Sequence, residues 1–306
     1  METKPILAIM YDFDKTLSPR EMQEYGLIPE LGMDPGEFWG ECTRITRAYK
    51  MDQMLSYMYL MVKKARGKML LNREKLVHLG EGVQLFPGVE TWFSRVNAYA
   101  ESRGLVPEHY ILSSGLKEII EGTSIAKEFK EIYAASFVYD EDGVPCWPAM
   151  AVNYTSKTQF MFRINKGVLD VTENRALNDY MPSERRRVPF TNMIYIGDGY
   201  TDVPCMRVTK INGGHSIAVW QKDRTIADRL LQENRVDFVC KADYSQGTEM
   251  EETVFAVIDQ VAAQNRTMRI NLASLDRAMR QARAKGNKEK DGKKEIVAVQ
   301  QQMLIE

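Results

Sequence analysis

The sequence predicts an α/β fold, in which helices cover a parallel β-sheet and a helical segment is inserted near the start of the chain. Short apolar runs that end in small polar or acidic residues recur along the chain, and helical stretches separate them. This alternation is typical of strands buried in a parallel sheet. A chain of 306 residues is long enough for two domains or for one large domain with an insertion.

Five apolar runs are predicted to form the strands of this sheet. In chain order they are 6–14, 109–115, 192–199, 216–220 and 236–243. The helix before the second strand is predicted at 87–104, because Pro87 stands near its start and Gly104 at its end. Turn-forming residues at 136–145 indicate a small hairpin after that strand.

The α/β core is predicted to consist of residues 1–18 and 87–264. The segment between them, 19–86, is rich in Met, Tyr, Leu, Lys and Glu and has few strand signals, so we expect an inserted helical subdomain. Its Met and Tyr residues are most simply interpreted as core residues. An insertion beside the end of a strand is, however, also the place where a lid would lie.

Residues 265–306 differ in composition and are predicted to form a basic C-terminal tail, helical or partly mobile. After Asn265 the tail holds ten Lys and Arg against five Asp and Glu, a net charge of +5. Helical spacing at 270–282 predicts a helix, whereas 285–294 is predicted to be a solvated linker. Because the tail has no interleaved aromatic residues, we interpret it as a solubilising extension rather than a nucleic-acid-binding arm.

Composition and charge argue against several classes of protein. The net charge of −1 gives no strong overall attraction to nucleic acid or acidic membranes. The four cysteines show no CxxC spacing, so we expect neither a zinc site nor a disulfide framework. This cysteine usage fits a protein of a reducing compartment. The apolar run at 6–10 is too short for a signal peptide, and no stretch approaches a membrane span. We therefore expect a cytoplasmic protein without a membrane or nucleic-acid partner, in an oligomeric state that the sequence leaves open.

Three of the predicted strands end in distinctive polar motifs: DFDKT at 12–16, SSG at 113–115 and GDGYTD at 197–202. In open parallel sheets, ligands bind outside the carboxyl ends of the strands, so these motifs would meet in one crevice. Several carboxylates together need a counter-charge, and Mg²⁺ suits a site with oxygen ligands only. The carboxylates expected there belong to Asp12, Asp14, Asp198 and Asp202.

The paired aspartates of the first motif indicate phosphoryl transfer. Asp12, at the strand end, is the candidate nucleophile that would form an aspartyl-phosphate. Asp14 would protonate the leaving alkoxide and later accept a proton from the attacking water. Ser113, or less favourably Ser114, would bind phosphate oxygens together with backbone N–H groups of the loop that contains Gly115. A lysine is still needed to balance the negative charge as it moves.

The three motifs resemble those of the haloacid dehalogenase (HAD) superfamily and specifically of its phosphatases, with phosphoserine phosphatase the most similar. The likeness covers residues 5–245 and implies a Rossmann-like core with a helical cap inserted directly after the first motif. It also implies Asp12 as nucleophile, Asp14 as general acid and base, and Ser113 as a phosphoryl-binding residue. Dehalogenases of the superfamily resemble this chain less, because they lack the second aspartate of the first motif.

The resemblance further implies a magnesium site and a catalytic lysine. The metal would be held by Asp12, the backbone carbonyl of Asp14 and Asp198, with Asp202 supporting the site. The family's third motif is a lysine at the start of a helix. Lys157, which opens a predicted helix, fits this motif better than Lys166, which ends it. The long separation from Lys157 to the last acidic motif is attributed to an added loop at 173–190.

The resemblance identifies the substrate less well than the chemistry. In phosphoserine phosphatase, a glutamate shortly after the first motif and an arginine in the cap recognise the amino acid. Glu21, with Glu24 as the alternative, would take the place of that glutamate. The cap shows no clear counterpart of the arginine, although Arg44 and Arg47 lie nearby in sequence. Phosphoserine therefore stays one candidate among small phosphorylated metabolites.

The sequence thus predicts a Mg²⁺-dependent phosphatase that hydrolyses a small phosphomonoester through an aspartyl-phosphate. One alternative keeps the chemistry but uses a nucleotide substrate, or an acceptor other than water. A second alternative is a catalytically idle binding or scaffold protein. Inactive members of the superfamily would be expected to lose an aspartate or the lysine, and this sequence keeps every candidate.

Overall fold

The computed structural model describes residues 4–302, except for the side chains of Glu184 and of residues 282–302. The chain divides into two units, Met1–Asp259 and Gln260–Glu306. The first unit contains the sheet and every candidate site residue. The second contains most of the long C-terminal helix.

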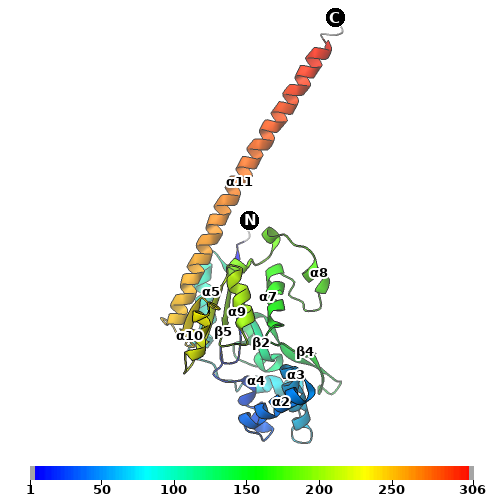
Figure 1. Cartoon of the computed structure of the whole chain (residues 1–306), viewed down its shortest axis with the longest axis vertical. Helices are drawn as coiled ribbons and strands as arrows, with labels where there is room; N and C mark the ends of the chain where they lie inside the picture. The colour runs from blue at the N-terminus through cyan, green and yellow to red at the C-terminus, as the bar shows by residue number, and fades with distance from the viewer. Residues whose placement is uncertain (1–3, 303–306) are drawn as a thin grey trace. The chain divides into compact units, whose positions relative to one another are not determined.

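A single sheet of seven strands forms the centre of the first unit (Figure 1). Its spatial order is β4-β3-β2-β1-β5-β6-β7, and all neighbouring pairs are parallel except β3 and β4. The strands are β1 (Ile6–Tyr11), β2 (Val106–Leu116), β3 (Phe129–Tyr139), β4 (Pro145–Met150), β5 (Met193–Gly197), β6 (His215–Trp220) and β7 (Phe238–Lys241). The predicted α/β class is confirmed.

All five predicted strands are present, and the hairpin at 136–145 is the connection between β3 and β4. The carboxylate of Asp140 holds its turn by accepting the backbone N–H groups of Asp142 and Val144 at 3.1 and 2.8 Å. The prediction missed that β3 begins at Phe129 and pairs with β2 for much of its length. The two consecutive charged residues near its start, Lys130 and Glu131, hide this strand in the sequence.

Alternate residues of β1 explain why helices cover both faces of the sheet. Ala8 and Met10 belong to a buried cluster with α7 (Lys157–Lys166), α9 (Val203–Ile211) and α10 (Thr225–Gln232). Tyr11 points to the other face, where its ring meets Phe93 of α5 (Val89–Ser102) at 5.9 Å. A strand buried on both faces must be apolar throughout, and β1 is.

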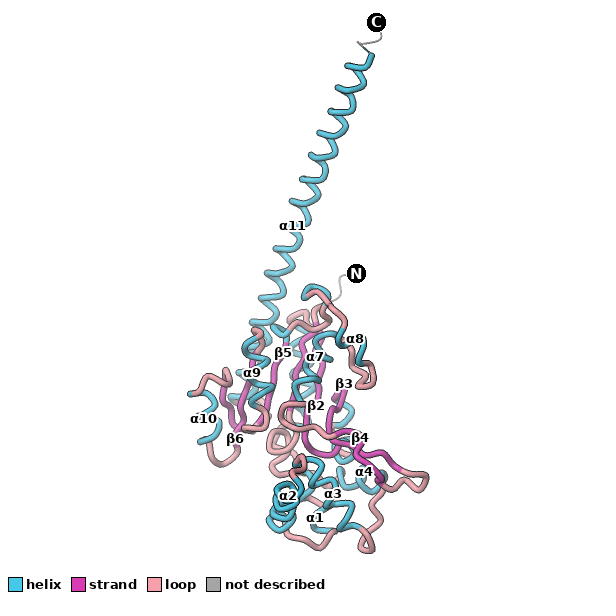
Figure 2. Tube along the Cα trace, turned by 45° about the vertical axis from the view of Figure 1, so that its right-hand side comes forward, coloured by secondary structure: helices cyan, strands magenta, loops and turns pink. Residues whose placement is uncertain are grey.

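Residues 19–86 contain helices and no regular strand, as predicted (Figure 2). The elements are η1 (Met22–Glu24), α1 (Leu27–Glu30), α2 (Pro35–Tyr49), α3 (Gln53–Ala65) and α4 (Arg73–Gly80). Asp34, Asp52 and Asn72 cap α2, α3 and α4 by accepting backbone N–H groups of the first turn. Both ribbon views show α2, α3 and α4 gathered at one end of the sheet.

Short helices join the remaining elements. These are α6 (Lys117–Glu121), η2 (Ala126–Glu128), α8 (Asn174–Asn178), η3 (Ser183–Arg185) and η4 (Phe190–Asn192). The predicted added loop at 173–190 is therefore built from α8 and two 3₁₀ turns. The buried guanidinium of Arg163 supports its start by donating to the carbonyls of Asp170 and Val171 at 2.7 and 3.0 Å.

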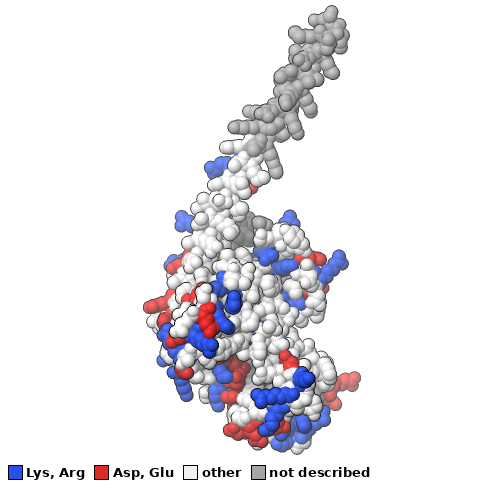
Figure 3. Space-filling view, in the orientation of Figure 1, with Lys and Arg blue, Asp and Glu red and all other residues white. Residues whose placement is uncertain are grey.

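The last helix, α11, spans Glu249–Gln302. Its first turns belong to the first unit and bury Met250, Val254 and Ile258. The predicted linker at 285–294 lies within the helix, and residues 303–306 lie outside the described residues. None of the described helices is both long enough and apolar enough to cross a membrane. On the face shown in Figure 3, Lys and Arg side chains are interspersed with Asp and Glu.

Candidate active site

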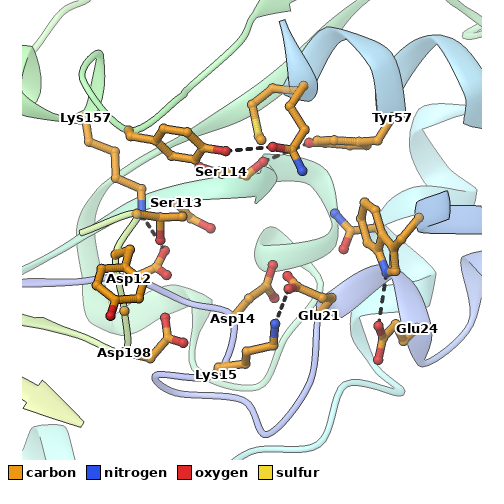
Figure 4. Close-up of a pocket in the computed structure, with 18 of the residues that line it drawn as sticks. Asp12, Asp14, Lys15, Glu21, Glu24, Tyr57, Ser113, Ser114, Lys157 and Asp198 are labelled. Carbon is orange, nitrogen blue, oxygen red and sulfur yellow. Dashed lines mark hydrogen bonds and ion pairs between the residues drawn. The ribbon is translucent and has the colours of Figure 1, made fainter. Parts of the chain in front are cut away.

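A cavity of about 510 Å³ lies at the carboxyl ends of β1, β2 and β5 (Figure 4). Its inner part is lined by residues of the three strand-end motifs together with the first residue of α7. Its outer part is lined by residues of η1, α2 and α3 from the helical insertion. The topology thus brings together residues that are up to 214 positions apart in the chain, from Asp12 to Ile226.

The loop after β1 positions the two aspartates of the first motif. Asp12 continues the sheet, because its backbone N–H donates to Ile196 of β5 at 2.9 Å. The chain then turns back on itself, with the N–H of Leu17 donating to the carbonyl of Phe13 at 2.9 Å. The turn requires a left-handed backbone at Lys15, with φ of 58°, which costs a non-glycine residue about 1 kcal/mol. Asp12 and Asp14 both face the cavity and are both largely buried.

Lys157 places a buried positive charge beside two of the aspartates. It is the first residue of α7, as predicted, and its side chain is 1% exposed. Its Nζ lies 2.9 Å from Oδ1 of Asp12 and 2.8 Å from Oδ1 of Asp202. Lys166 ends the same helix and instead donates to the carbonyls of Leu177 and Asp179. The structure therefore brings Lys157 and not Lys166 to the site.

Asp202 is fully buried and its two carboxylate oxygens accept hydrogen bonds from several directions. Oδ1 accepts from Lys157 and from the hydroxyl of Tyr195, both at 2.8 Å. Oδ2 accepts from the backbone N–H of Asp198 at 3.1 Å and more weakly from that of Gly199. Asp202 does not line the cavity. Its contacts fit the supporting role that the resemblance implies, because it fixes both the lysine and the loop that carries Asp198.

Burial and mutual repulsion raise the pKa values of three carboxyl groups of the site. Burial raises the pKa of Asp12 to about 7, with Asp202 adding to the effect and Lys157 opposing it. Burial, Asp202 and Asp12 together raise the pKa of Asp198 to about 8. The pKa of Asp14 is also raised, by burial, by Glu21 and by Asp12. Because these three carboxyl groups are hard to ionise, a cation bound beside them would stabilise their ionised form.

The carboxylates fit a divalent cation with a preference for oxygen. One carboxylate oxygen each from Asp12, Asp198 and Asp202 lies within 4.8 Å of the others. Asp12 and Asp198 line the cavity, and no described residue donates a hydrogen bond to the Asp198 carboxylate. Oxygen donors without His or Cys suit Mg²⁺ rather than zinc or copper. The carboxylate of Asp14 already accepts the backbone N–H of Met22 at 2.8 Å.

The end of β2 brings the second motif beside the aspartates. Ser113 and Ser114 line the cavity. The Ser113 hydroxyl oxygen accepts the N–H of Gly115 at 3.0 Å, and the buried Ser114 hydroxyl has no partner among the described residues. Gly115 does not line the cavity, but a Cβ there would lie 2.1 Å from Cε of Met22. Glycine at this position thus leaves room for the end of the Met22 side chain, which comes from η1.

Glu21 lies at the cavity, as predicted, and is held in an ion pair with Lys15 at 2.5 Å. Glu24, the alternative, also lines the cavity and accepts the indole N–H of Trp39 at 3.1 Å. Arg44 and Arg47 are exposed on α2 and do not line it. The absence of a cap arginine, noted from the sequence, therefore holds for the described residues that line the cavity.

Sequence reasoning missed several residues of the cavity wall. Trp39 and Tyr57 come from the helical insertion, and Tyr154 lies just before α7. The Tyr57 hydroxyl donates to the carbonyl of Ser114 at 2.9 Å, and that of Tyr154 to the side chain of Gln53 at 2.7 Å. These bonds join the insertion to the core. Only Tyr57 had a signal in the sequence, in the richness of 52–65 in Met and Tyr, and this composition is also typical of core residues.

The comparisons with known proteins agree with this geometry. A family model described as haloacid dehalogenase-like hydrolase matches residues 9–207. An uncharacterized protein of Borreliella burgdorferi is 28% identical over 278 residues, which cover 81% of this chain and 95% of that protein.

Two solved structures share the fold at low sequence identity. A probable phosphoserine phosphatase from Vibrio cholerae has a TM-score of 0.52 and 14% identity, covering 85% of this chain and 68% of that one. A HAD family hydrolase from Salmonella enterica serovar Typhi has a TM-score of 0.50 and 17% identity, covering 74% of this chain and 66% of that one. Because the matched residues 9–207 are more than half of the chain and include Asp12, Lys157 and Asp198, the chain belongs to the haloacid dehalogenase-like hydrolase family.

Proposed function

We propose that this hydrolase is a Mg²⁺-dependent phosphatase that cleaves a small phosphomonoester through an aspartyl-phosphate on Asp12. The observation that carries the proposal is the position of the Asp12 carboxylate. It lies at a strand end, faces the cavity and is held 2.9 Å from Lys157, with Asp14 two residues away. A carboxylate fixed beside a cation is suited to in-line attack on phosphorus.

In the first step, an oxygen of Asp12 attacks the phosphorus atom and the bond to the leaving alkoxide breaks. Asp14 donates its proton to that alkoxide, and its raised pKa keeps a proton available for this role. Ser113 and the backbone N–H groups of the strand-end loops bind phosphate oxygens. Lys157 compensates the negative charge that accumulates between Asp12 and the phosphoryl group.

In the second step, Asp14 accepts a proton from water as the water attacks the phosphorus atom of the aspartyl-phosphate. The bond between phosphorus and Asp12 breaks, inorganic phosphate leaves, and the free carboxylate is restored. Asp12 and Asp198, with the backbone carbonyl of Asp14, would hold Mg²⁺. The ion would supply positive charge next to the phosphoryl oxygens.

A phosphatase assay tests this proposal. Wild type, Asp12→Asn and the control Asp34→Asn are compared on p-nitrophenyl phosphate, with Mg²⁺ and with EDTA. Asp34 caps α2 from an exposed position, so its variant controls for the loss of one carboxylate. We expect activity that requires Mg²⁺, persists in Asp34→Asn and is lost in Asp12→Asn. Equal activity of Asp12→Asn and wild type would contradict the proposal.

A further inference from the structure

The outer part of the cavity, where a leaving group would lie, carries excess negative charge. Among the described residues, Glu21 and Glu24 line this outer part beside a single cationic side chain, Lys15, and the other lysine of the cavity, Lys157, lies in the inner part. Both lysines are already paired, Lys15 with Glu21 and Lys157 with Asp12. None of the described residues that line the cavity is an arginine or a histidine. A leaving group with its own carboxylate would thus find no cationic partner there.

Glu24 is the unpaired carboxylate of this outer part. Its Oε1 accepts the indole N–H of Trp39 at 3.1 Å (Figure 4), and it forms no ion pair among the described residues. Glu21 differs, because Lys15 lies 2.5 Å from its Oε1. A partly buried carboxylate without a counter-ion favours a cationic ligand.

Aromatic rings and an unpartnered acceptor stand next to Glu24. Trp39 and Tyr57 both line the cavity, with ring centroids 6.1 Å apart and planes at 72°. Aromatic faces attract ammonium groups through their quadrupole, Trp most strongly. Gln23, which precedes Glu24 and also lines the cavity, is 1% exposed, and its Oε1 accepts from no described residue. A buried acceptor without a donor is costly unless a ligand supplies one.

We propose that the leaving group of the substrate carries an ammonium group and no carboxylate, as in the phosphate ester of a small amino alcohol. Glu24 and Trp39 bind the ammonium group, while the phosphate lies against Asp12 and Lys157. This inference rests on the proposed phosphatase function. It departs from recognition of a phosphorylated amino acid, because none of the described residues that line the cavity offers an unpaired cation to a carboxylate of the substrate.

Matched substrate pairs test the charge of the leaving group. Phosphoethanolamine is compared with propyl phosphate, which replaces the ammonium group by a methyl group, and with phosphoserine, which adds a carboxylate. Phosphocholine is compared with its uncharged analogue 3,3-dimethylbutyl phosphate. We expect kcat/KM to be at least about tenfold higher for an ammonium ester than for its neutral partner, and higher for phosphoethanolamine than for phosphoserine.

A pair of variants tests the assignment to Glu24. In Glu24→Gln, the ratio of kcat/KM between ammonium ester and neutral partner should fall to about one. The ratio is measured within one preparation, so a smaller fraction of folded enzyme does not change it. Glu74→Gln, an exposed glutamate on α4, is the matched control and should keep the wild-type ratio.

The outcomes separate this inference from the proposed function. Mg²⁺-dependent hydrolysis of p-nitrophenyl phosphate with no preference for either ammonium ester would overturn the inference and leave the phosphatase function standing. A preference that survives in Glu24→Gln would overturn the assignment of the ammonium site to Glu24. No hydrolysis of any ester, p-nitrophenyl phosphate included, would contradict the proposed function and the inference together.

Discussion

At the scale of single residues, one buried lysine, Lys157, forms ion pairs with two aspartates of the site, Asp12 and Asp202. Burial alone would lower the pKa of Lys157, but the carboxylates of Asp12 and Asp202 raise it above its usual value. The lysine is therefore charged at neutral pH. In the proposed mechanism, its charge keeps Asp12 in place and offsets the phosphoryl charge during transfer.

Replacing Lys157 by methionine, which keeps length and packing but removes the charge, should lower kcat/KM at least about 100-fold. It should also lower the free energy of unfolding by about 3 kcal/mol, because Asp12 and Asp202 lose their buried counter-ion. Steady-state kinetics and urea titration measure the two effects. The control is Lys166→Met at the other end of α7, which should keep its activity. Loss of activity only in Lys166→Met would show that the wrong lysine has been assigned.

The reactive residues could be predicted from sequence for a simple geometric reason. Each follows or lies close to an apolar strand, and the carboxyl ends of parallel strands meet at one edge of the sheet. Lys157 needed the family resemblance, because a lysine that opens a helix has no chemical signal of its own. Trp39 and the paired state of Glu21 could not be predicted, since both depend on how the helical insertion folds over the strand ends.

At the scale of elements, the insertion contacts the core through a backbone approach that only glycine permits. A Cβ on Gly122, which ends α6, would lie 1.7 Å from the carbonyl oxygen of Val77 in α4. A Cβ on Gly80 would lie 2.1 Å from the carbonyl oxygen of Ile119. The neighbours are backbone atoms, which cannot turn away as a side chain can. The fit of α4 against α6 therefore depends on these two glycines.

Gly122→Ala should lower the free energy of unfolding by roughly 1–3 kcal/mol, because α4 must move away from α6. Thermal or urea unfolding measures the change. Gly82→Ala is the matched control, since a Cβ there meets nothing closer than 3.7 Å. Equal stability of the two variants would show that α4 and α6 do not approach as closely as described.

A second element contact predicts a pH dependence. His109 of β2 is buried between the Tyr11 hydroxyl at 3.0 Å and the Asn97 side chain at 2.9 Å, and burial lowers its pKa to about 3. In the unfolded chain this imidazole gains a proton near its ordinary value of about 6.5. Its contribution to stability is therefore complete above that value and is lost as the pH falls toward 3.

His109→Gln should remove this contribution. Its free energy of unfolding should fall less steeply than that of wild type as the pH is lowered from neutrality toward 4. Urea titrations of both proteins across that range give the comparison. Parallel curves would show that His109 is not held neutral in the folded protein.

At the scale of the whole molecule, the parallel sheet could be predicted from the apolar runs, whereas the strand β3 could not. Its first residues pair with β2 but include two consecutive charged side chains, Lys130 and Glu131, so they lack the continuous apolar run of the other strands. The length of α11 was also beyond prediction, because the glycines at 286 and 292 and the lysine-rich composition around them favour a linker. The buried strands are the elements best predicted from local sequence, because burial on both faces restricts their residues to apolar types.

The carboxyl cluster links the metal to the stability of the whole protein. Since burial raises the pKa values of Asp12 and Asp198, their contribution to metal-free stability is complete below the unfolded pKa of about 3.8 and is lost as the pH rises through about 7 and 8. The proposed Mg²⁺ would bind the ionised groups, so its stabilising effect should grow over the same range.

The difference in Tm with and without Mg²⁺ should therefore increase as the pH rises through 7 and 8. Thermal melts in Mg²⁺ and in EDTA at several pH values measure it. The same melts on Asp198→Asn should show a much smaller difference. A shift in Tm that is equal at every pH, or unchanged in Asp198→Asn, would place the bound metal elsewhere.

If Asp12 carries the phosphoryl group during turnover, as proposed, the phosphorylated enzyme can be detected. Wild type and Asp12→Asn are mixed with substrate and Mg²⁺, quenched in acid within one turnover, digested and mapped by mass spectrometry. We expect a phosphorylated peptide modified at Asp12 in wild type and none in Asp12→Asn. Phosphate release by wild type with no adduct, or with an adduct on another residue, would contradict the proposed mechanism.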